Sequence, residues 1–308
     1  MTDSNLRPKK KRHKSWLALR LELLVYKGIQ LVLRLMPLRL VRLVGRILGA
    51  LSSRIFSRRT RLAVGNVRTT FPERKPEAHQ EIVAECWRHF CAELLIYIRS
   101  LNLPAATIAS GIEVVGRDLF DSVRALDKGV IVYSAHFGSW ESAITVLPTL
   151  GLPFTVVARA LDNELIDRDV VRGRERAVRI VNRRRAARDL IGALRKGEGV
   201  VVLPDQAVLP REGAVVPFLG RPAWTMTAPA RLALKFGAPM IGCFAVPDGT
   251  RIRVEFRSPI VIDNLEEGER NEAGVTRLMN DAISGVIREH PEYWLWLHDR
   301  WKRVGTTA

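Results

Sequence analysis

Hydrophobic and polar positions alternate with two different periods along this chain, and the periods predict its secondary structure. Short runs of apolar, mostly β-branched residues, such as GVIVYS at 129–134 and GVVVL at 199–203, are typical of buried strands. Longer segments with apolar residues three or four positions apart predict amphipathic helices. Strands are expected at 112–115, 129–134, 154–158, 199–203, 240–245 and 251–256, and helices at 74–100, 117–127, 139–149, 163–177, 185–196, 223–236 and 271–289.

The alternation of these strands with helices indicates the fold class. It predicts an α/β domain with a mixed, mostly parallel central sheet flanked by helices. A chain of 308 residues with 47% hydrophobic content can bury a core of that size. We expect a basic tail at 1–15, an amphipathic membrane-associated helical segment at 16–58 and the α/β domain at 59–308.

The positive charge of the chain is concentrated at its N-terminal end. The formal net charge is +17, and residues 1–60 contain 15 lysines and arginines but only two acidic residues, Asp3 and Glu22. From Trp16 to Phe56 leucines are frequent and a charge recurs every few residues, so no uncharged run is long enough for a membrane-spanning helix. The segment also lacks the compact apolar core and small-residue cleavage site of a secretory signal peptide.

The spacing of these charges predicts two basic amphipathic helices that meet near Pro37. Arg20, Lys27 and Arg34 are seven positions apart and therefore stay on one side of a helix, with leucines between them. Such helices lie in a membrane interface with their arginines toward anionic headgroups. Two alternatives remain: the leucines pack on the domain, or the basic residues bind nucleic acid. The second is disfavoured because base-stacking aromatic residues are sparse.

The segment SAHFGSWESA at 134–143 holds the candidate catalytic residues. His136 follows a predicted strand, and in open α/β sheets the sites form where strands end. His136 and Glu141 are five positions apart and would diverge on one continuous helix, but Glu141 can reach back if His136 lies in a loop that turns at Gly138. The pair would then act as a general base and its carboxylate. The alternative is a loop histidine beside a glutamate that complements a helix dipole.

No nucleophile motif accompanies this pair. Gly-x-Ser-x-Gly and Walker motifs are absent, and no cysteine, histidine or carboxylate cluster has the spacing of a metal site. A histidine–acid pair without its own nucleophile suits the activation of a hydroxyl on a substrate, and acyl transfer to an alcohol is a reaction of that kind. The three cysteines, Cys86, Cys91 and Cys243, are too scattered for a disulfide framework, so a reducing compartment is expected.

Six segments, in order, resemble the bacterial lipid A biosynthesis acyltransferase family (lauroyl and myristoyl transferases), in the wider superfamily with a His-x4-Asp/Glu motif. They are RLAVGNVRTTFPE at 61–73, GVIVYSAHFGSWE at 129–141, ARALDNELIDRDVVRGR at 158–174, LRKGEGVVVLPDQ at 194–206, GAVVPFLGRPAWTMTAPARLALKFGAPMI at 213–241 and HPEYWLWLHDRWK at 290–302. Because all six occur in sequence, the resemblance is far more specific than the short motif around His136.

The resemblance implies a glycerol-phosphate-acyltransferase-like fold and transfer of a fatty acyl group to a hydroxyl of a membrane glycolipid, most closely a lipid A precursor. The donor would be a thioester of acyl carrier protein or coenzyme A, with no other cofactor. His136 would remove the hydroxyl proton while Glu141 holds the imidazole. Arg174 is the candidate oxyanion donor or phosphate contact. Arg159 follows the predicted strand at 154–158, and this position at a strand end makes it a candidate headgroup contact.

Other residues have alternative roles. Asp205 and Gln206 follow the predicted strand at 199–203 and would either orient the acceptor or brace the loop. The closing segment interleaves Trp294, Trp296 and Trp301 with cations, which suits a structural cap better than a membrane contact. His298 is expected to be a hydrogen-bonded packing residue.

These features lead to an expected place and set of partners. The resemblance and the basic helices together imply the cytoplasmic face of the cell inner membrane, with membrane lipids and an acyl carrier protein or acyl-CoA as partners, and no nucleic acid. The alternatives are an acyltransferase for another glycolipid, an aminolipid or a lysophospholipid, and a non-enzymatic membrane scaffold with a degenerate site.

Overall fold

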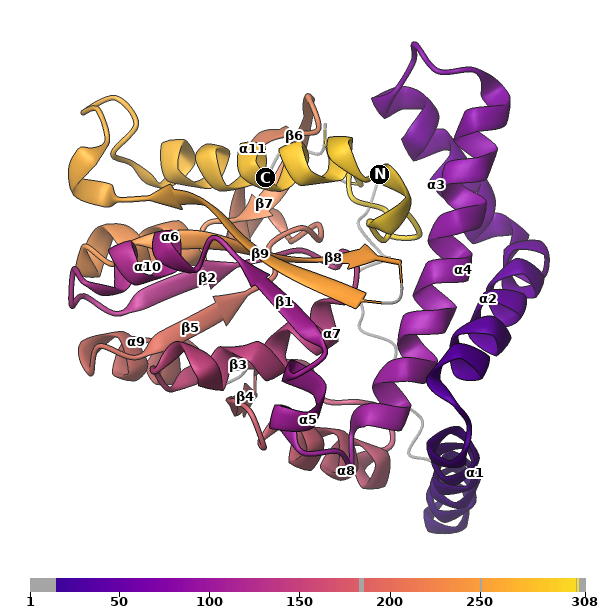
Figure 1. The fold of residues 1–308 in the computed structure, drawn as a ribbon. Helices are drawn as coiled ribbons and strands as arrows, with labels where there is room; N and C mark the ends of the chain where they lie inside the picture. Colours follow the sequence, from indigo (N-terminus) through magenta and orange to yellow (C-terminus); the bar gives the residue numbers. More distant parts are fainter. Residues whose placement is uncertain (1–14, 183–185, 250, 303, 305–308) are drawn as a thin grey trace.

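The computed structural model describes residues 15–182, 186–249, 251–302 and 304, and these form an α/β domain with a layer of helices beside it (Figure 1). The predicted basic tail at 1–15 lies outside the described residues except for Ser15. The strands are β1 (Ile112–Val115), β2 (Val130–Tyr133), β3 (Phe154–Ala158), β4 (Arg179–Asn182), β5 (Gly199–Val202), β6 (Gly213–Phe218), β7 (Arg221–Met226), β8 (Met240–Asp248) and β9 (Arg251–Ile260). The helices are α1 (Trp16–Leu35), α2 (Leu38–Ile55), α3 (Ser57–Thr70), α4 (Pro76–Ser100), α5 (Ala105–Ala109), α6 (Arg117–Arg124), α7 (Trp140–Ala143), α8 (Glu164–Arg174), α9 (Ala186–Arg195), α10 (Ala228–Phe236) and α11 (Glu272–Glu289).

The central sheet is mixed and mostly parallel, as predicted. Its strand order is β1-β9-β8-β2-β5-β3-β4, and β6 and β7 form a separate hairpin. Strands β8, β2, β5, β3 and β4 are parallel to one another, while β9 is antiparallel to β8. The carboxyl ends of β2 and β5 therefore lie side by side in the middle of the sheet, which is where ligand sites form in such folds.

Alternating residues of the central strands supply two hydrophobic cores. Ile131 and Tyr133 of β2 belong to the core shared with α9, α10, α11 and the closing tryptophans. Val130 and Val132 face the opposite core, against α6 and the segment after α7. A strand buried on both faces has no polar face, which explains why β2 reads as a continuous apolar run.

The two N-terminal helices have the predicted form and are joined at Pro37. Gly45 and Gly49 place α2 directly on α4, because a β-carbon at either position would lie 2.4 Å from backbone atoms of α4. Helix α1 is connected to α8 by polar contacts, including the ion pair of Lys27 with Asp169 (2.6 Å). Figure 1 shows α2, α3 and α4 as one layer at the end of the sheet. None of the helices in the described ranges combines the length and apolar character needed to cross a bilayer.

Several predicted elements differ from the observed ones. The expected helix at 223–236 is a strand up to Met226, and α10 begins only at Ala228, because the segment pairs with β6 in a hairpin. The expected helix at 139–149 narrows to a 3₁₀ turn over Ile144–Leu150, which contains Pro148. Strand β4 and the β6–β7 hairpin were not predicted.

Candidate active site

The parallel pairing of β2 with β5 brings His136 to Asp205. Tyr133 lies opposite Val202 in the register of the two strands. His136 and Asp205 each lie three residues beyond this pair, so the two loops place them at the same level along the strand direction. The pairing continues through a hydrogen bond from the backbone N–H of Ser134 to the carbonyl of Val202 (2.9 Å). Two residues 69 positions apart in the sequence thus become neighbours at the sheet edge.

The carboxylate of Asp205 is buried and accepts three hydrogen bonds. Its Oδ1 lies 2.9 Å from Nδ1 of His136, while Oδ2 accepts the backbone N–H of His136 (3.0 Å) and the indole N–H of Trp294 (2.9 Å). Only 2% of the Asp205 side chain is exposed. Burial alone would raise the pKa of Asp205, but the charge of His136 and these hydrogen bonds lower it to about 2. Asp205 is therefore ionised and acts only as an acceptor.

An ionised Asp205 defines the tautomer of the imidazole. Because a carboxylate can only accept, Nδ1 of His136 carries the proton and Nε2 is left with its lone pair in the neutral ring. Burial would lower the pKa of His136, but the charge and hydrogen bond of Asp205 and the charge of Glu141 outweigh it, and the pKa is raised. About a quarter of the side chain, 26%, is exposed. The ring is therefore an accessible base of enhanced strength.

The closing segment, residues 290–302, lies against this site and contacts both His136 and Asp205. Besides the bond of Trp294 to Asp205, the backbone N–H of Leu295 donates to the carbonyl of His136 (3.0 Å). Trp294 and Trp296 are buried, as is Trp301. The interpretation of this segment as a structural cap is confirmed, since its tryptophans lie in the core and one of them, Trp294, donates a hydrogen bond to the carboxylate of Asp205.

His298 fixes the loop that carries Asp205. Its Nε2 accepts the backbone N–H of Ala207 (3.0 Å). Burial, with the nearby cations Lys302 and Arg300, lowers the pKa of His298 to about 4, so the ring is neutral and can accept. The prediction of a hydrogen-bonded packing residue is confirmed.

The turn after His136 requires its glycine. Gly138 has a φ of +55°, and a β-carbon there would lie 1.8 Å from the carbonyl oxygen of Ala245. The backbone N–H of Gly138 donates to the carbonyl of Tyr293 (3.0 Å). The tight turn expected from the sequence is present, and it allows the loop to pass between β8 and the closing segment.

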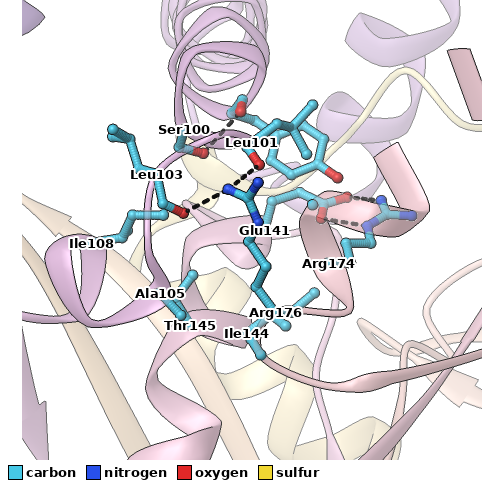
Figure 2. Close-up of a pocket in the computed structure, with 13 residues that line it drawn as sticks. Ser100, Leu101, Leu103, Ala105, Ile108, Glu141, Ile144, Thr145, Arg174 and Arg176 are labelled. Carbon is cyan, nitrogen blue, oxygen red and sulfur yellow. Dashed lines mark hydrogen bonds and ion pairs between the residues drawn. The ribbon is translucent and has the colours of Figure 1, made fainter. Parts of the chain in front are cut away.

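Glu141 holds Arg174 instead of His136, which corrects the expected pair. Both Nε and Nη2 of Arg174 donate to the two carboxylate oxygens of Glu141, with the Nε bond at 3.2 Å (Figure 2). The carboxylate bonded to the imidazole is Asp205. Glu141 lies in the first turn of the short helix α7, which begins at Trp140, and Arg174 is the last residue of α8, so the helices direct the two side chains toward each other and not toward the ring. Glu141 acts on His136 only through its charge.

A cavity next to this ion pair is small. It lies between α4, α5 and the segment after α7, and Figure 2 shows Arg176 crossing it to the carbonyls of Leu101 and Leu103 (3.2 and 3.3 Å). Its volume is about 30 Å³, which holds about two water molecules. In this conformation it does not have room for a fatty acyl chain.

The two remaining predicted residues lie at different distances from the histidine. The amide nitrogen of Gln206 is 3.5 Å from both ring nitrogens of His136. Because the two distances are equal and long, the amide lies over the face of the ring and does not point along the lone pair of either nitrogen. No closer partner within the described part of the chain occupies its N–H groups, so they can donate to a substrate. Arg159 is exposed directly after β3, two strands from β2 in the sheet.

This combination defines a class of protein. An accessible histidine base, a buried carboxylate that orients it and an amide donor beside it lie at the strand ends of an α/β sheet, with no nucleophilic side chain aligned to the ring among the described residues. Such a site is built to remove a proton from a nucleophile that the substrate provides.

Comparison with known proteins specifies the class further. The chain belongs to the bacterial lipid A biosynthesis acyltransferase family, whose model matches residues 8–303. It is similar to the lipid A biosynthesis lauroyltransferase of Escherichia coli K12 (28% identical over 270 residues, 87% of either chain) and to the palmitoleoyltransferase of the same strain (26% over 87% of this chain and 86% of the relative). It is also similar to the phosphatidylinositol mannoside acyltransferase of Mycolicibacterium smegmatis (24% over 68% and 71%). The protein is therefore an enzyme that transfers acyl groups to a lipid A or other glycolipid acceptor.

Proposed function

We propose that this enzyme transfers a fatty acyl chain from the thioester of acyl carrier protein or coenzyme A to a hydroxyl of a lipid A precursor. The observation that supports this most directly is the His136–Asp205 pair, whose free Nε2 is positioned to accept a proton from an incoming hydroxyl. The similarity to lipid A acyltransferases over most of the chain favours the lipid A acceptor over a mannoside, an aminolipid or a lysophospholipid.

The proposed reaction follows from the protonation states at the site. Nε2 of His136 takes the proton of the acceptor hydroxyl as its oxygen attacks the thioester carbonyl, and a C–O bond forms. The tetrahedral intermediate then expels the thiolate, which takes the same proton from Nε2 as the C–S bond breaks. Asp205 stabilises the imidazolium between the two steps and stays ionised. The thioester is the co-substrate, and the proposal includes no further cofactor.

The oxygen of the intermediate needs hydrogen-bond donors. Arg174, the donor expected from the resemblance, already gives Nε and Nη2 to Glu141. The amide of Gln206 lies beside the base and makes no shorter contact with the residues that the structure describes, so we assign it to the thioester oxygen. Arg159 is exposed at the same sheet edge and is proposed as a headgroup contact.

The site belongs at a membrane surface in this proposal. Most exposed large hydrophobic residues among the described ones are on α1 and α2, including Leu17, Leu24 and Leu35, each more than 65% exposed. Such exposure argues against the alternative in which these leucines pack on the domain. With Arg20, Arg34 and Arg39 among them, the two helices suit an anionic interface, and we propose the cytoplasmic face of the inner membrane.

Acylation assays with purified protein test this function. The wild-type protein should transfer an acyl group from the carrier-protein or coenzyme A thioester to a lipid A precursor in preference to a mannoside or lysophospholipid. His136→Ala should lower kcat by about 10³-fold because the base is lost, whereas His290→Ala, the same change outside the site, should leave it unchanged. Equal thioester consumption by wild-type and His136→Ala protein would instead indicate a non-catalytic scaffold.

A further inference from the structure

Helix α3 has one face that no other part of the described structure covers. Arg58, Arg61, Gly65 and Arg68 are spaced so that they lie within about 80° around the helix axis. All three arginines are exposed, and a β-carbon at Gly65 would meet no atom within 4 Å. The buried residues of α3, such as Ala63 and Val67, point in the opposite direction. We call this exposed strip the α3 arginine face.

The α3 arginine face is purely cationic. The helix contains four arginines and no acidic residue, and among the described residues none of Arg58, Arg61 and Arg68 forms an ion pair. The fourth, Arg59, is turned away and donates to the carbonyl of Leu297 (3.3 Å). Unneutralised charges of one sign over about 15 Å of helix attract a partner of the opposite sign.

This face differs from the surface proposed to contact the membrane. On α1 and α2 the exposed arginines alternate with exposed leucines, which is the composition of an interfacial helix. On α3 none of the described residues is an exposed large hydrophobic one. A convex, charged surface without an apolar component is suited to electrostatic docking of a protein and offers nothing to insert into a bilayer.

The buried face of α3 is connected to the catalytic loop. Nδ2 of Asn66 donates to the carbonyl of His298 (3.3 Å), and Nε2 of His298 accepts the backbone N–H of Ala207 (3.0 Å). Ala207 follows Gln206, which lies over the ring of His136. A partner bound to the α3 arginine face would thus be linked to the loop of Gln206 through α3 itself and the closing segment.

We propose that the α3 arginine face docks an acidic protein that carries the acyl chain as a thioester. The proposal rests on the proposed function and adds the surface that selects the donor. The charge of the face would hold the carrier beside the closing segment while its thioester enters the site. A nucleotide-linked thioester would gain less, because a nucleotide is bound in a concave pocket and this face is convex.

The test reverses the charge of the face and compares two soluble donors. In Arg58→Glu/Arg61→Glu/Arg68→Glu, KM for acyl carrier protein thioester should rise by about tenfold or more at low salt, and the rise should shrink as ionic strength increases. Activity with acyl-N-acetylcysteamine, a thioester without a protein, should be unchanged. The matched control is Arg195→Glu/Lys196→Glu/Lys235→Glu, which changes the charge equally with exposed residues beside the opposite ends of β5 and β8.

The outcomes separate this inference from the function itself. An unchanged KM for the carrier thioester, or an equal rise of KM in the control, would overturn the proposal that this face is a docking surface, and the proposed acyltransferase function would be unaffected. Loss of binding to vesicles of anionic phospholipid, with KM for the carrier unchanged in detergent, would reassign the face to the membrane and also overturn it. Absence of acyl transfer by the wild-type protein from either donor would contradict the proposed function instead.

Discussion

At the scale of residues, the site depends on one balance between burial and charge. His136 is mostly buried, and burial favours its neutral form, yet Asp205 and Glu141 raise its pKa. Asp205 tolerates burial because three N–H groups surround it. The base must be neutral to accept a proton, so kcat/KM should rise with pH through a pKa above the ordinary value of histidine.

Replacement of Asp205 by asparagine tests this arrangement. In Asp205→Asn a single amide oxygen must serve three donors, and an NH₂ group turned toward Nδ1 would force the proton onto Nε2 and remove the base. We expect kcat to fall by about 10³- to 10⁴-fold. The rising limb of the pH–rate profile should also move to lower pH, because the charge that raised the pKa of His136 is lost.

Glu141→Gln is the informative comparison. The substitution removes a charge that also raises the pKa of His136, so the rising limb of the pH–rate profile should again move to lower pH. Asp205 still holds the proton on Nδ1 of His136, and kcat at the plateau of the profile should therefore fall less than in Asp205→Asn. A larger decrease of kcat in Glu141→Gln than in Asp205→Asn would instead support the original expectation that Glu141 is the carboxylate partner of His136.

At the scale of elements, local sequence determines helices well and strand pairing poorly. The N-terminal helices divide at Pro37 as predicted, because a proline in the interior of an α-helix removes a backbone hydrogen bond and clashes with the preceding turn. The segment 221–226 was expected to be helical, but it forms β7 because β6 offers it hydrogen bonds along its length. The helical spacing of apolar residues in this segment corresponds to an observed helix only from Ala228 onward.

The contact of α2 with α4 depends on two glycines. A methyl group at Gly49 would lie 2.4 Å from the carbonyl of Trp87, and helix backbones cannot yield as a side chain can. We expect Gly49→Ala to lower the free energy of unfolding by about 1–3 kcal/mol in urea titrations. Gly28→Ala, in the neighbouring helix α1 with no atom within 4 Å, should instead raise it by about 0.5–1 kcal/mol. Equal changes in the free energy of unfolding for the two variants would mean that α2 does not pack closely on α4.

At the scale of the whole molecule, the helical layer presents an apolar, basic surface and also supports the site. α1 contacts α8, which ends at Arg174, and α3 contacts the closing segment. The predicted boundary between 16–58 and 59–308 remains a prediction, although α2 packs on α4, and α1 contacts both α4 and α8.

Vesicle sedimentation tests the membrane role of α1. Leu21→Gln/Leu24→Gln removes two exposed leucines, and if both enter the bilayer, binding to phosphatidylglycerol vesicles should weaken by about 10²-fold. Leu126→Gln/Val215→Gln makes the same kind of change at exposed positions of the α/β domain and should leave binding intact. If both pairs behave alike, the membrane does not contact α1.

The sequence by itself determined the α/β class, the basic amphipathic helices, His136 as the candidate base and the tight turn at Gly138, because each is encoded within a few neighbouring residues. Only the tertiary structure decided which carboxylate bonds to this histidine. Asp205 lies 69 positions from His136, and only the parallel register of β2 and β5, with the closing Trp294 beside them, brings it within 2.9 Å of Nδ1. Glu141 was close in sequence, but the direction of a side chain on a helix depends on what the helix packs against, and here that is Arg174.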